Sequence, residues 1–196
     1  MLTQLTTLTA VRSRLALTDT TYDDILTIAI AAVSARFDSE TNRTLSRTEN
    51  FTQEFDSSDT EILARCYPIE TVTNFETKSS EAEGWQEVQP APDYLIRQVC
   101  VISLSAPLST LHSSLARITY AGGYVLPGAI PTNGQTPLPP DLENAAVEQL
   151  AFWFQNRDKL GLKTAWGYHA SYQQFATLDL LPSVAATLKN YQRWTL

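Results

Sequence analysis

The feature that most constrains this chain is an apolar helix predicted over residues 140–160, directly after a Pro-rich loop. On a wheel of 100° per residue, this helix keeps one narrow polar stripe, formed by Asn144, Glu148, Gln155 and Lys159. Its apolar side chains point in almost every other direction: Leu142, Val147, Leu150, Phe152, Trp153 and Phe154. A small chain rarely covers so much apolar surface by itself, so the pattern predicts a helix between its own domain and a partner. It favours an assembly subunit over an enzyme.

Length and composition predict one globular domain, with or without an inserted lobe. The chain has 196 residues, 43% of them hydrophobic and 18% charged, which is enough for a real core. No run of 18 apolar residues and no secretory signal are recognisable, so we expect neither a membrane span nor export. Two cysteines, Cys66 and Cys100, are too few for a disulfide framework, and we expect reduced thiols.

The net charge of −7 is concentrated in the middle of the chain. Lys plus Arg against Asp plus Glu number 4 and 5 over residues 1–43, 5 and 11 over 44–120, and 5 and 5 over 121–196. The middle segment therefore carries −6 of the total. Binding of DNA through its phosphates needs a basic stripe, which this sequence lacks. This excludes a protein that grips DNA, but not one that surrounds it.

The first segment, residues 1–43, is predicted to be a pair of helices. A short helix over 7–17 has Thr7 as its cap, and a stronger helix runs over 21–41. The core-facing arc of the second helix is expected to hold Tyr22, Ile25, Leu26, Ala29, Ile30, Val33 and Phe37.

The remaining segments complete an α+β fold. Residues 44–120 alternate with a period of 2 and predict a small lobe of about five to seven strands. Residues 121–196 hold the Pro-rich loop, the apolar helix and a last helix that begins at Pro182. We expect 1–43 and 121–196 to form one antiparallel helical domain, into which the β-rich lobe is inserted.

Residues that catalyse reactions or bind metals and cofactors were sought and none is predicted. His112 and His169 have no second His, Cys or carboxylate at metal-ligand spacing. Gly122 and Gly123 match no phosphate-binding pattern and predict a turn at the end of a strand. The sequence therefore gives no catalytic residue, no metal ligand and no cofactor.

An aromatic segment near the end of the chain has two interpretations. It comprises Trp166, Tyr168, Tyr172 and Phe175, with Tyr191 and Trp194 further on. These side chains either close the core of the chain or form a contact with another protein, because Trp and Tyr dominate binding hot spots.

Five motifs, in this order, carry a resemblance to a known family. They are the helix pair TLTAVRSRLALTDTTYDDILTIAIAAVSARFDSETNRTL, the strand YPIETVTNF, the phrase ITYAGGY, the helix PPDLENAAVEQLAFWFQNRD and the closing LLPSVAATLKNYQRW. In these motifs the chain resembles the head–tail connector proteins of long-tailed phages, also called head-completion or adaptor proteins, and their prophage and gene-transfer-agent relatives. The β-rich lobe makes it longer than the minimal all-helical members.

The resemblance implies a structural virion protein of the neck and not an enzyme. About twelve copies would form a ring under the capsid portal protein and join it to the next neck or tail-terminator protein, with DNA passing through the channel. The protein would be found in the virion, and in the host cytoplasm during assembly. No membrane partner is expected.

The predicted contact residues fall into two sets. Subunit contacts in the ring are expected at Ile28, Ala31, Ala35, Val147, Phe152 and Phe154. Portal contacts are expected at Trp166, Tyr168, Tyr172, Phe175, Tyr191 and Trp194.

Two alternatives stay open at this point. One is a tail-terminator or tail-completion protein of the same neck, although the N-terminal helix pair argues against it. The other is a cytoplasmic hydrolase with its site in the β-rich lobe, which requires a pocket with convergent titratable groups.

Overall fold

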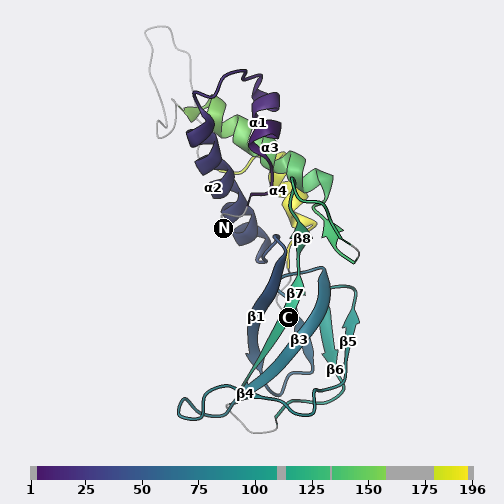
Figure 1. The fold of residues 1–196 in the computed structure, drawn as a ribbon. Helices are drawn as coiled ribbons and strands as arrows, with labels where there is room; N and C mark the ends of the chain where they lie inside the picture. Colours follow the sequence, from purple (N-terminus) through teal and green to yellow (C-terminus); the bar gives the residue numbers. More distant parts are fainter. Residues whose placement is uncertain (1–3, 110–113, 133, 158–178, 194–196) are drawn as a thin grey trace. The chain divides into compact units, whose positions relative to one another are not determined.

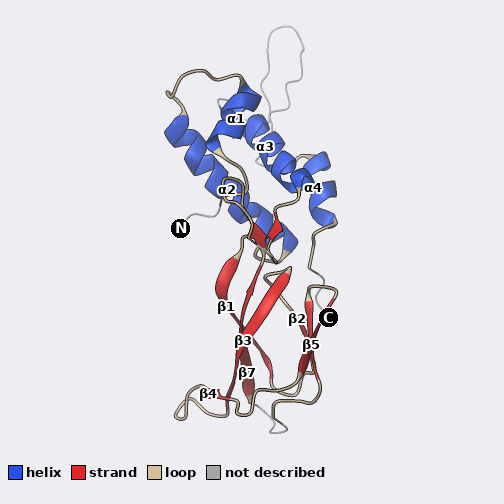
Figure 2. Ribbon diagram, turned by 45° about the vertical axis from the view of Figure 1, so that its right-hand side comes forward, coloured by secondary structure: helices blue, strands red, loops and turns tan. Residues whose placement is uncertain are grey.

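The computed structural model describes residues 4–109, 114–132, 134–157 and 179–193, and the chain divides into two compact units. A helical unit comprises Met1–Thr41 and Leu138–Gln192, and a β unit comprises Asn42–Pro137 and Arg193–Leu196. Figures 1 and 2 show the helices in the first unit and the strands in the second. The α+β fold predicted from the periodicity is confirmed.

Within the described residues, the helical unit is built from four helices: α1 (Leu8–Leu15), α2 (Asp23–Thr41), α3 (Pro140–Gln155) and α4 (Pro182–Lys189). Two of their starts follow the predicted signals. The Thr7 hydroxyl accepts a hydrogen bond from the Ala10 amide at 3.2 Å, and Pro140 occupies the first turn of α3. From residue 158 onward, the helix predicted over 140–160 lies outside the described residues.

Helix α3 contacts all three other helices of its unit, and α2 also contacts α1 and α4. The apolar side chains that the helices bury are Val11, Leu26, Ile30, Val33, Phe37, Leu142, Ala145, Ala146, Val147, Leu150, Ala151, Val184 and Leu188. None of the helices in the described ranges is long and apolar enough to span a bilayer.

The β unit contains two antiparallel sheets. The larger has the order β1-β7-β3-β4, formed by β1 (Thr48–Asp56), β7 (Leu115–Gly122), β3 (Ile69–Lys78) and β4 (Gln86–Glu87). The smaller has the order β2-β6-β5, formed by β2 (Glu61–Leu63), β6 (Val101–Leu104) and β5 (Tyr94–Arg97). Side chains of both sheets share one core cluster: Ile62, Ala64, Cys66, Ile69, Phe75, Ile102, Leu104, Ile118 and Tyr120.

The segment 121–137, predicted to lie with the C-terminal helices, is part of the β unit instead. The Tyr124 amide donates to the Leu45 carbonyl, and the Arg47 amide donates to the Tyr124 carbonyl, both at 2.8 Å. Two short strands, β8 (Tyr124–Val125) and β9 (Thr136–Pro137), then pair in parallel. These backbone bonds hold the segment against the β unit. The five to seven strands predicted for residues 44–120 agree with the seven strands β1–β7 that begin there in the described residues, and the two-residue strands β8 and β9 add to them in a segment where no strand is predicted.

Tyr120 organises a buried hydrogen-bond network in the β unit. Its hydroxyl accepts from the amides of Arg65 and Cys66 at 3.1 and 3.0 Å and donates to the Gln53 side-chain oxygen at 3.1 Å. Burial raises the pKa of Tyr120 to about 12. This network explains why the first of the two aromatic residues in the phrase ITYAGGY carries a hydroxyl.

The glycines of the same phrase allow a close approach of two backbones. A Cβ atom at Gly122 would lie 2.5 Å from the Cys66 carbonyl oxygen, and Gly123 has a φ of 96°. Gly122 is the last residue of β7, so the predicted turn at the end of a strand is confirmed.

Candidate assembly surface

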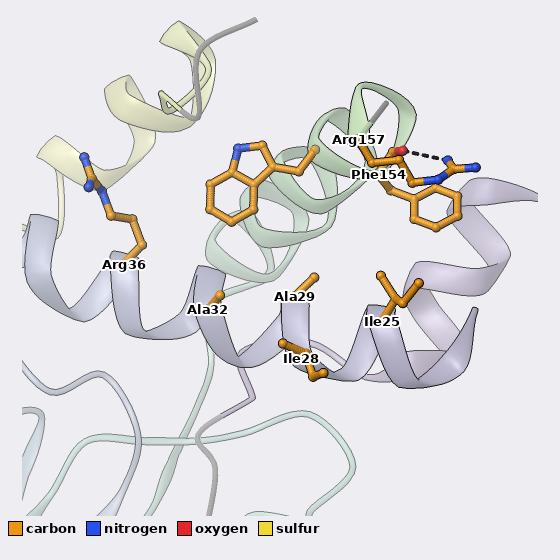
Figure 3. Close-up of a pocket in the computed structure, with 8 residues that line it drawn as sticks. Ile25, Ile28, Ala29, Ala32, Arg36, Phe154 and Arg157 are labelled. Carbon is orange, nitrogen blue, oxygen red and sulfur yellow. Dashed lines mark hydrogen bonds between the residues drawn. The ribbon is translucent and has the colours of Figure 1, made fainter. Parts of the chain in front are cut away.

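An apolar groove runs between α2 and the C-terminal end of α3, as Figure 3 shows. Its volume is about 540 Å³. Six of the lining residues are apolar and two are arginines: Ile25, Ile28, Ala29, Ala32, Trp153, Phe154, Arg36 and Arg157. Small alanines lie in its middle, and larger side chains surround them, so the surface is hollowed at the centre.

The groove exists because α2 has a second apolar face beside its buried one. Ile25, Ile28, Ala29 and Ala32 follow the i, i+3, i+4, i+7 spacing that places residues on one side of a helix. Ile25 and Ile28 are 54% and 71% exposed. The prediction that Ile25 lies on the core-facing arc is therefore wrong, and Ala29 is only half-buried. The neighbouring helices fully bury only the side of α2 that carries Leu26, Ile30, Val33 and Phe37.

The α3 side of the groove is held by a stack of rings and one cation. The Phe154 ring meets the Tyr22 ring edge-on, with centroids 5.2 Å apart and planes at 81°. The Arg157 guanidinium lies 4.3 Å from the Phe154 centroid and 5.2 Å from that of Tyr22. Its Nη1 also donates to the Phe154 carbonyl at 2.8 Å. These contacts hold the α3 side of the groove in place within a single copy of the chain.

The charges at the groove have one sign. Arg36 and Arg157 lie near its two ends, and no acidic residue is among the lining residues. Arg36 forms an ion pair with Glu40 at 2.7 Å, one turn further along α2. This pair is exposed and stabilises the helix only slightly. The groove therefore offers an apolar floor between two guanidinium groups.

Most of the apolar surface of α3 is covered by its own unit. Leu142, Ala145, Ala146, Val147, Leu150 and Ala151 are buried. Phe152, Trp153 and Phe154 are only half-buried. The chain therefore covers more of this helix than its sequence pattern predicts, and the uncovered apolar part is its last turn.

A second exposed apolar strip lies on the β unit. β5 is an edge strand, all four of its residues are exposed, and Leu95 reaches 71% exposure. A row of unpaired backbone groups with apolar side chains is a site at which another strand can add.

Comparison with known proteins decides the family. A family model described as "Head completion protein" matches residues 4–194. The chain belongs to the head completion protein family. No curated protein matches the chain significantly.

Two solved structures share the fold of this head completion protein. One, titled "Neck of empty GTA particle computed with C6 symmetry", is 16% identical with a TM-score of 0.62. The other, titled "Neck of native GTA particle computed with C12 symmetry", is 17% identical with a TM-score of 0.51. Each comparison covers 100% of this chain and 97% of the other. The resemblance stated from the sequence motifs is therefore confirmed at the level of family and fold.

The residues predicted to form subunit contacts in this family member do not all lie together. Ile28 and Phe154 line the groove. Ala35 is exposed, while Ala31 and Phe152 are half-buried, and none of the three lines the groove. Val147 is 8% exposed and lines a shallow pocket beside α1, so it offers little surface. Ala29, Ala32 and Trp153 also line the groove. Ala29 and Ala32 lie four and seven residues after Ile25, a helical spacing that places them on the same face, whereas no such spacing relates Trp153 to its neighbour Phe154.

Of the residues predicted to contact the portal, one can be described. Tyr191 follows α4, and its hydroxyl donates to the Asp141 carboxylate, with distances of 2.7 and 2.8 Å to the two oxygens. That contact joins the end of α4 to the start of α3. The other five, Trp166, Tyr168, Tyr172, Phe175 and Trp194, lie outside the described residues.

One structural residue was missed because its type suggested the surface. Gln149 lies on α3 and is 0% exposed. Its Nε2 donates to the Asp179 carbonyl at 3.2 Å, and its Oε1 accepts from the Leu181 amide at 2.9 Å. It therefore fastens the segment before α4 to α3.

The described residues contain no group of three or more His, Cys, Asp or Glu side chains that is placed to hold a metal ion. The large pKa shift of Tyr120 belongs to a buried residue whose hydrogen bonds are structural. The groove itself contains no titratable group other than its two arginines. Its chemistry is that of a contact surface.

Proposed function

We propose that this head completion protein is a ring-forming head–tail connector of a phage-like particle. In this proposal about twelve copies form a ring under the capsid portal and join it to the next neck or tail-terminator protein. DNA passes through the ring, and the protein acts structurally, without catalysis. It is part of the virion neck, after assembly in the host cytoplasm.

The observation that carries this proposal is the open groove of Ile25, Ile28, Trp153 and Phe154, in a chain whose family match covers residues 4–194. The fold shared with chains from necks of C6 and C12 symmetry supports a ring of copies. A closed ring buries such surfaces through head-to-tail contacts between identical subunits.

The charge of the chain suits DNA that moves through a channel. Asp and Glu exceed Lys and Arg by seven, and six of these excess negative charges lie in residues 44–120. A surface of this sign does not hold phosphates, so it leaves DNA free to slide. We expect no measurable binding of the purified protein to duplex DNA, even at low salt.

Portal contact is assigned in this proposal to the C-terminal aromatic residues Trp166, Tyr168, Tyr172, Phe175, Tyr191 and Trp194. Ring contact is assigned to the exposed members of the first set, Ile28 and Ala35, with the half-buried Ala31, Phe152 and Phe154. Val147 is buried and supports the helix from inside.

The test is reconstitution of the ring on its portal. The purified full-length protein is mixed with the portal protein of the same particle and examined by light scattering and negative-stain imaging. We expect a ring of about twelve copies bound to the portal, including when the free protein is monomeric. Absence of any complex would contradict the proposal, and recovery of the protein on tails that lack heads would favour a tail-terminator role.

A further inference from the structure

The β unit carries a stiff loop with an apolar tip. The pairing of Tyr124 with Thr136 and of Val125 with Pro137 closes the base of this loop. At its tip, Ile130 is 90% exposed, more than any other large apolar side chain of the described residues. We call the segment Leu126–Pro131 the knob.

The backbone of the knob is restricted by two prolines and by one internal hydrogen bond. Pro127 and Pro131 fix their φ angles, and Gly128 has a φ of 94°, in the left-handed region. The Ala129 amide donates to the Leu126 carbonyl at 3.2 Å. A segment that is already ordered loses little entropy when it binds, so the exposed Ile130 is prepared for a contact.

The acidic charge of the chain limits which surface of a second copy the knob can contact. Each copy carries −7, so two copies repel unless they meet through surfaces without acidic residues. The stretch 126–139 contains no charged residue at all. The groove between α2 and α3 contains no acid among its lining residues and has an arginine near each end. Neither surface has an acidic residue of its own, and Glu40, one turn beyond the groove on α2, is paired with Arg36.

The shape of the groove between α2 and α3 also suits the knob. The alanines Ala29 and Ala32 leave the middle of the groove hollow, and Trp153 lies on the side of α3. A volume of about 540 Å³ is ample for one branched aliphatic side chain and the adjacent proline. The guanidinium groups at the ends can donate to loop carbonyls, which a Pro-rich segment leaves unpaired because it has few amides.

We infer that Ile130 of one copy binds in the α2–α3 groove of the next copy. A head-to-tail ring needs two different surfaces on each subunit that match each other, and the knob and the groove form such a pair. The inference rests on the proposed ring and names the contact that closes it.

Cysteine pairing tests this contact. In a Cys100→Ser background, Ile130→Cys is combined with Ala32→Cys in the groove, and the protein is oxidised after assembly on the portal. A disulfide requires Cα atoms within about 7 Å, so it reports direct contact. The control combines Ile130→Cys with Asn144→Cys, which is exposed on the polar stripe of α3.

We expect a ladder of dimers and higher multimers on non-reducing gels from the groove pair and none from the control. A cross-linked species that stays monomeric would place the knob in the groove of its own copy and overturn the inference. Rings without any cross-link would also overturn it while leaving the proposed function intact. Failure of the wild-type protein to form rings on the portal would refute both.

A charge substitution gives an independent measurement. Ile130→Asp should weaken the subunit contact by roughly ten- to a hundredfold, the factor that corresponds to burial of one large aliphatic side chain. Ile130→Leu should assemble normally. Leu95→Asp, on the exposed β5 edge, is the matched control and should also assemble. If Leu95→Asp abolishes the ring and Ile130→Asp does not, the β5 edge forms the contact and the knob does not.

Discussion

Replacement of Gln149 by leucine tests how the C-terminal part of the helical unit is held. The side chain is fully buried, and its amide forms two hydrogen bonds to the backbone at Asp179 and Leu181, which lead into α4. Leucine has a similar volume and forms neither bond. The substitution therefore removes the polar contacts and creates little cavity.

The expected cost follows from the groups that lose their partners. The Leu181 amide loses its acceptor and the Asp179 carbonyl loses this donor. Asp179 is exposed, so the main cost comes from the half-buried Leu181 amide. A buried polar group left without a partner costs about 1–3 kcal/mol, and the more apolar leucine offsets part of the loss. We expect a decrease of about 1–2 kcal/mol in the free energy of unfolding, which for a chain of this size corresponds to a melting temperature lower by about 2–8 °C.

Two measurements separate this effect from a general loss of stability. Thermal unfolding followed by circular dichroism gives the melting temperature, and hydrogen exchange reports the local opening of α4. Gln155→Leu, at an exposed position on the same helix, should change the free energy of unfolding by about 0.5 kcal/mol or less. An unchanged or higher melting temperature for Gln149→Leu, with α4 equally protected, would show that the two hydrogen bonds do not hold this segment.

Three further predictions concern single positions. Tyr120→Phe removes an acceptor of the buried Cys66 amide and one of the two acceptors of the Arg65 amide, and it should cost about 1–3 kcal/mol in the free energy of unfolding. Burial raises the pKa of Tyr120 to about 12, from 10.0, so its contribution to the free energy of unfolding is full below pH 10 and decreases as pH rises toward 12. Urea titrations at pH 8 and pH 11 should therefore show that the free energy of unfolding decreases less between these two pH values in Tyr120→Phe than in the wild-type protein. Gly122→Ala places a Cβ 2.5 Å from a backbone oxygen and should lower the urea midpoint more than Gly84→Ala, whose Cβ meets no atom within 4 Å. Trp153→Ala should lower the free energy of unfolding, measured by calorimetry, by roughly 2 kcal/mol, which is about half the value for a fully buried aromatic residue. The same substitution should abolish ring assembly, because Trp153 lines the groove. Normal rings would show that the groove is not the subunit contact.

The sequence predicted those parts of the fold that depend on local signals. Two helix starts are observed as predicted: Thr7 caps α1, and Pro140 occupies the first turn of α3, each at the beginning of an apolar period of 3.6. The change of period to 2 after residue 43 marks the β unit correctly. Segment 121–137 was misplaced because its position depends on long-range backbone bonds from Tyr124, which no local pattern encodes.

The candidate site was predicted less well, for a physical reason. An apolar side chain on a helix can face either the core or a groove, and the hydrophobic period is the same for both. Ile25 and Leu26 are neighbours of equal hydrophobicity, yet one is 54% exposed and the other fully buried. Only the positions of α3 and α4 decide between them, so the spacing predicted the helix and not the groove.

The apolar surface that stays exposed in the helical unit belongs to α2 as much as to α3. The sequence pattern places the excess apolar surface on α3, but that helix lies among α1, α2 and α4 and is mostly buried by them. Ile25 and Ile28, together with the half-buried Trp153 and Phe154 at the end of α3, stay uncovered. An exposed apolar surface of this kind promotes aggregation unless a partner binds it. The two arginines are the charged residues that line it and oppose aggregation. The persistence of this surface is explained if a partner covers it during particle assembly, and the uncharged knob of a second copy has the chemistry to do so.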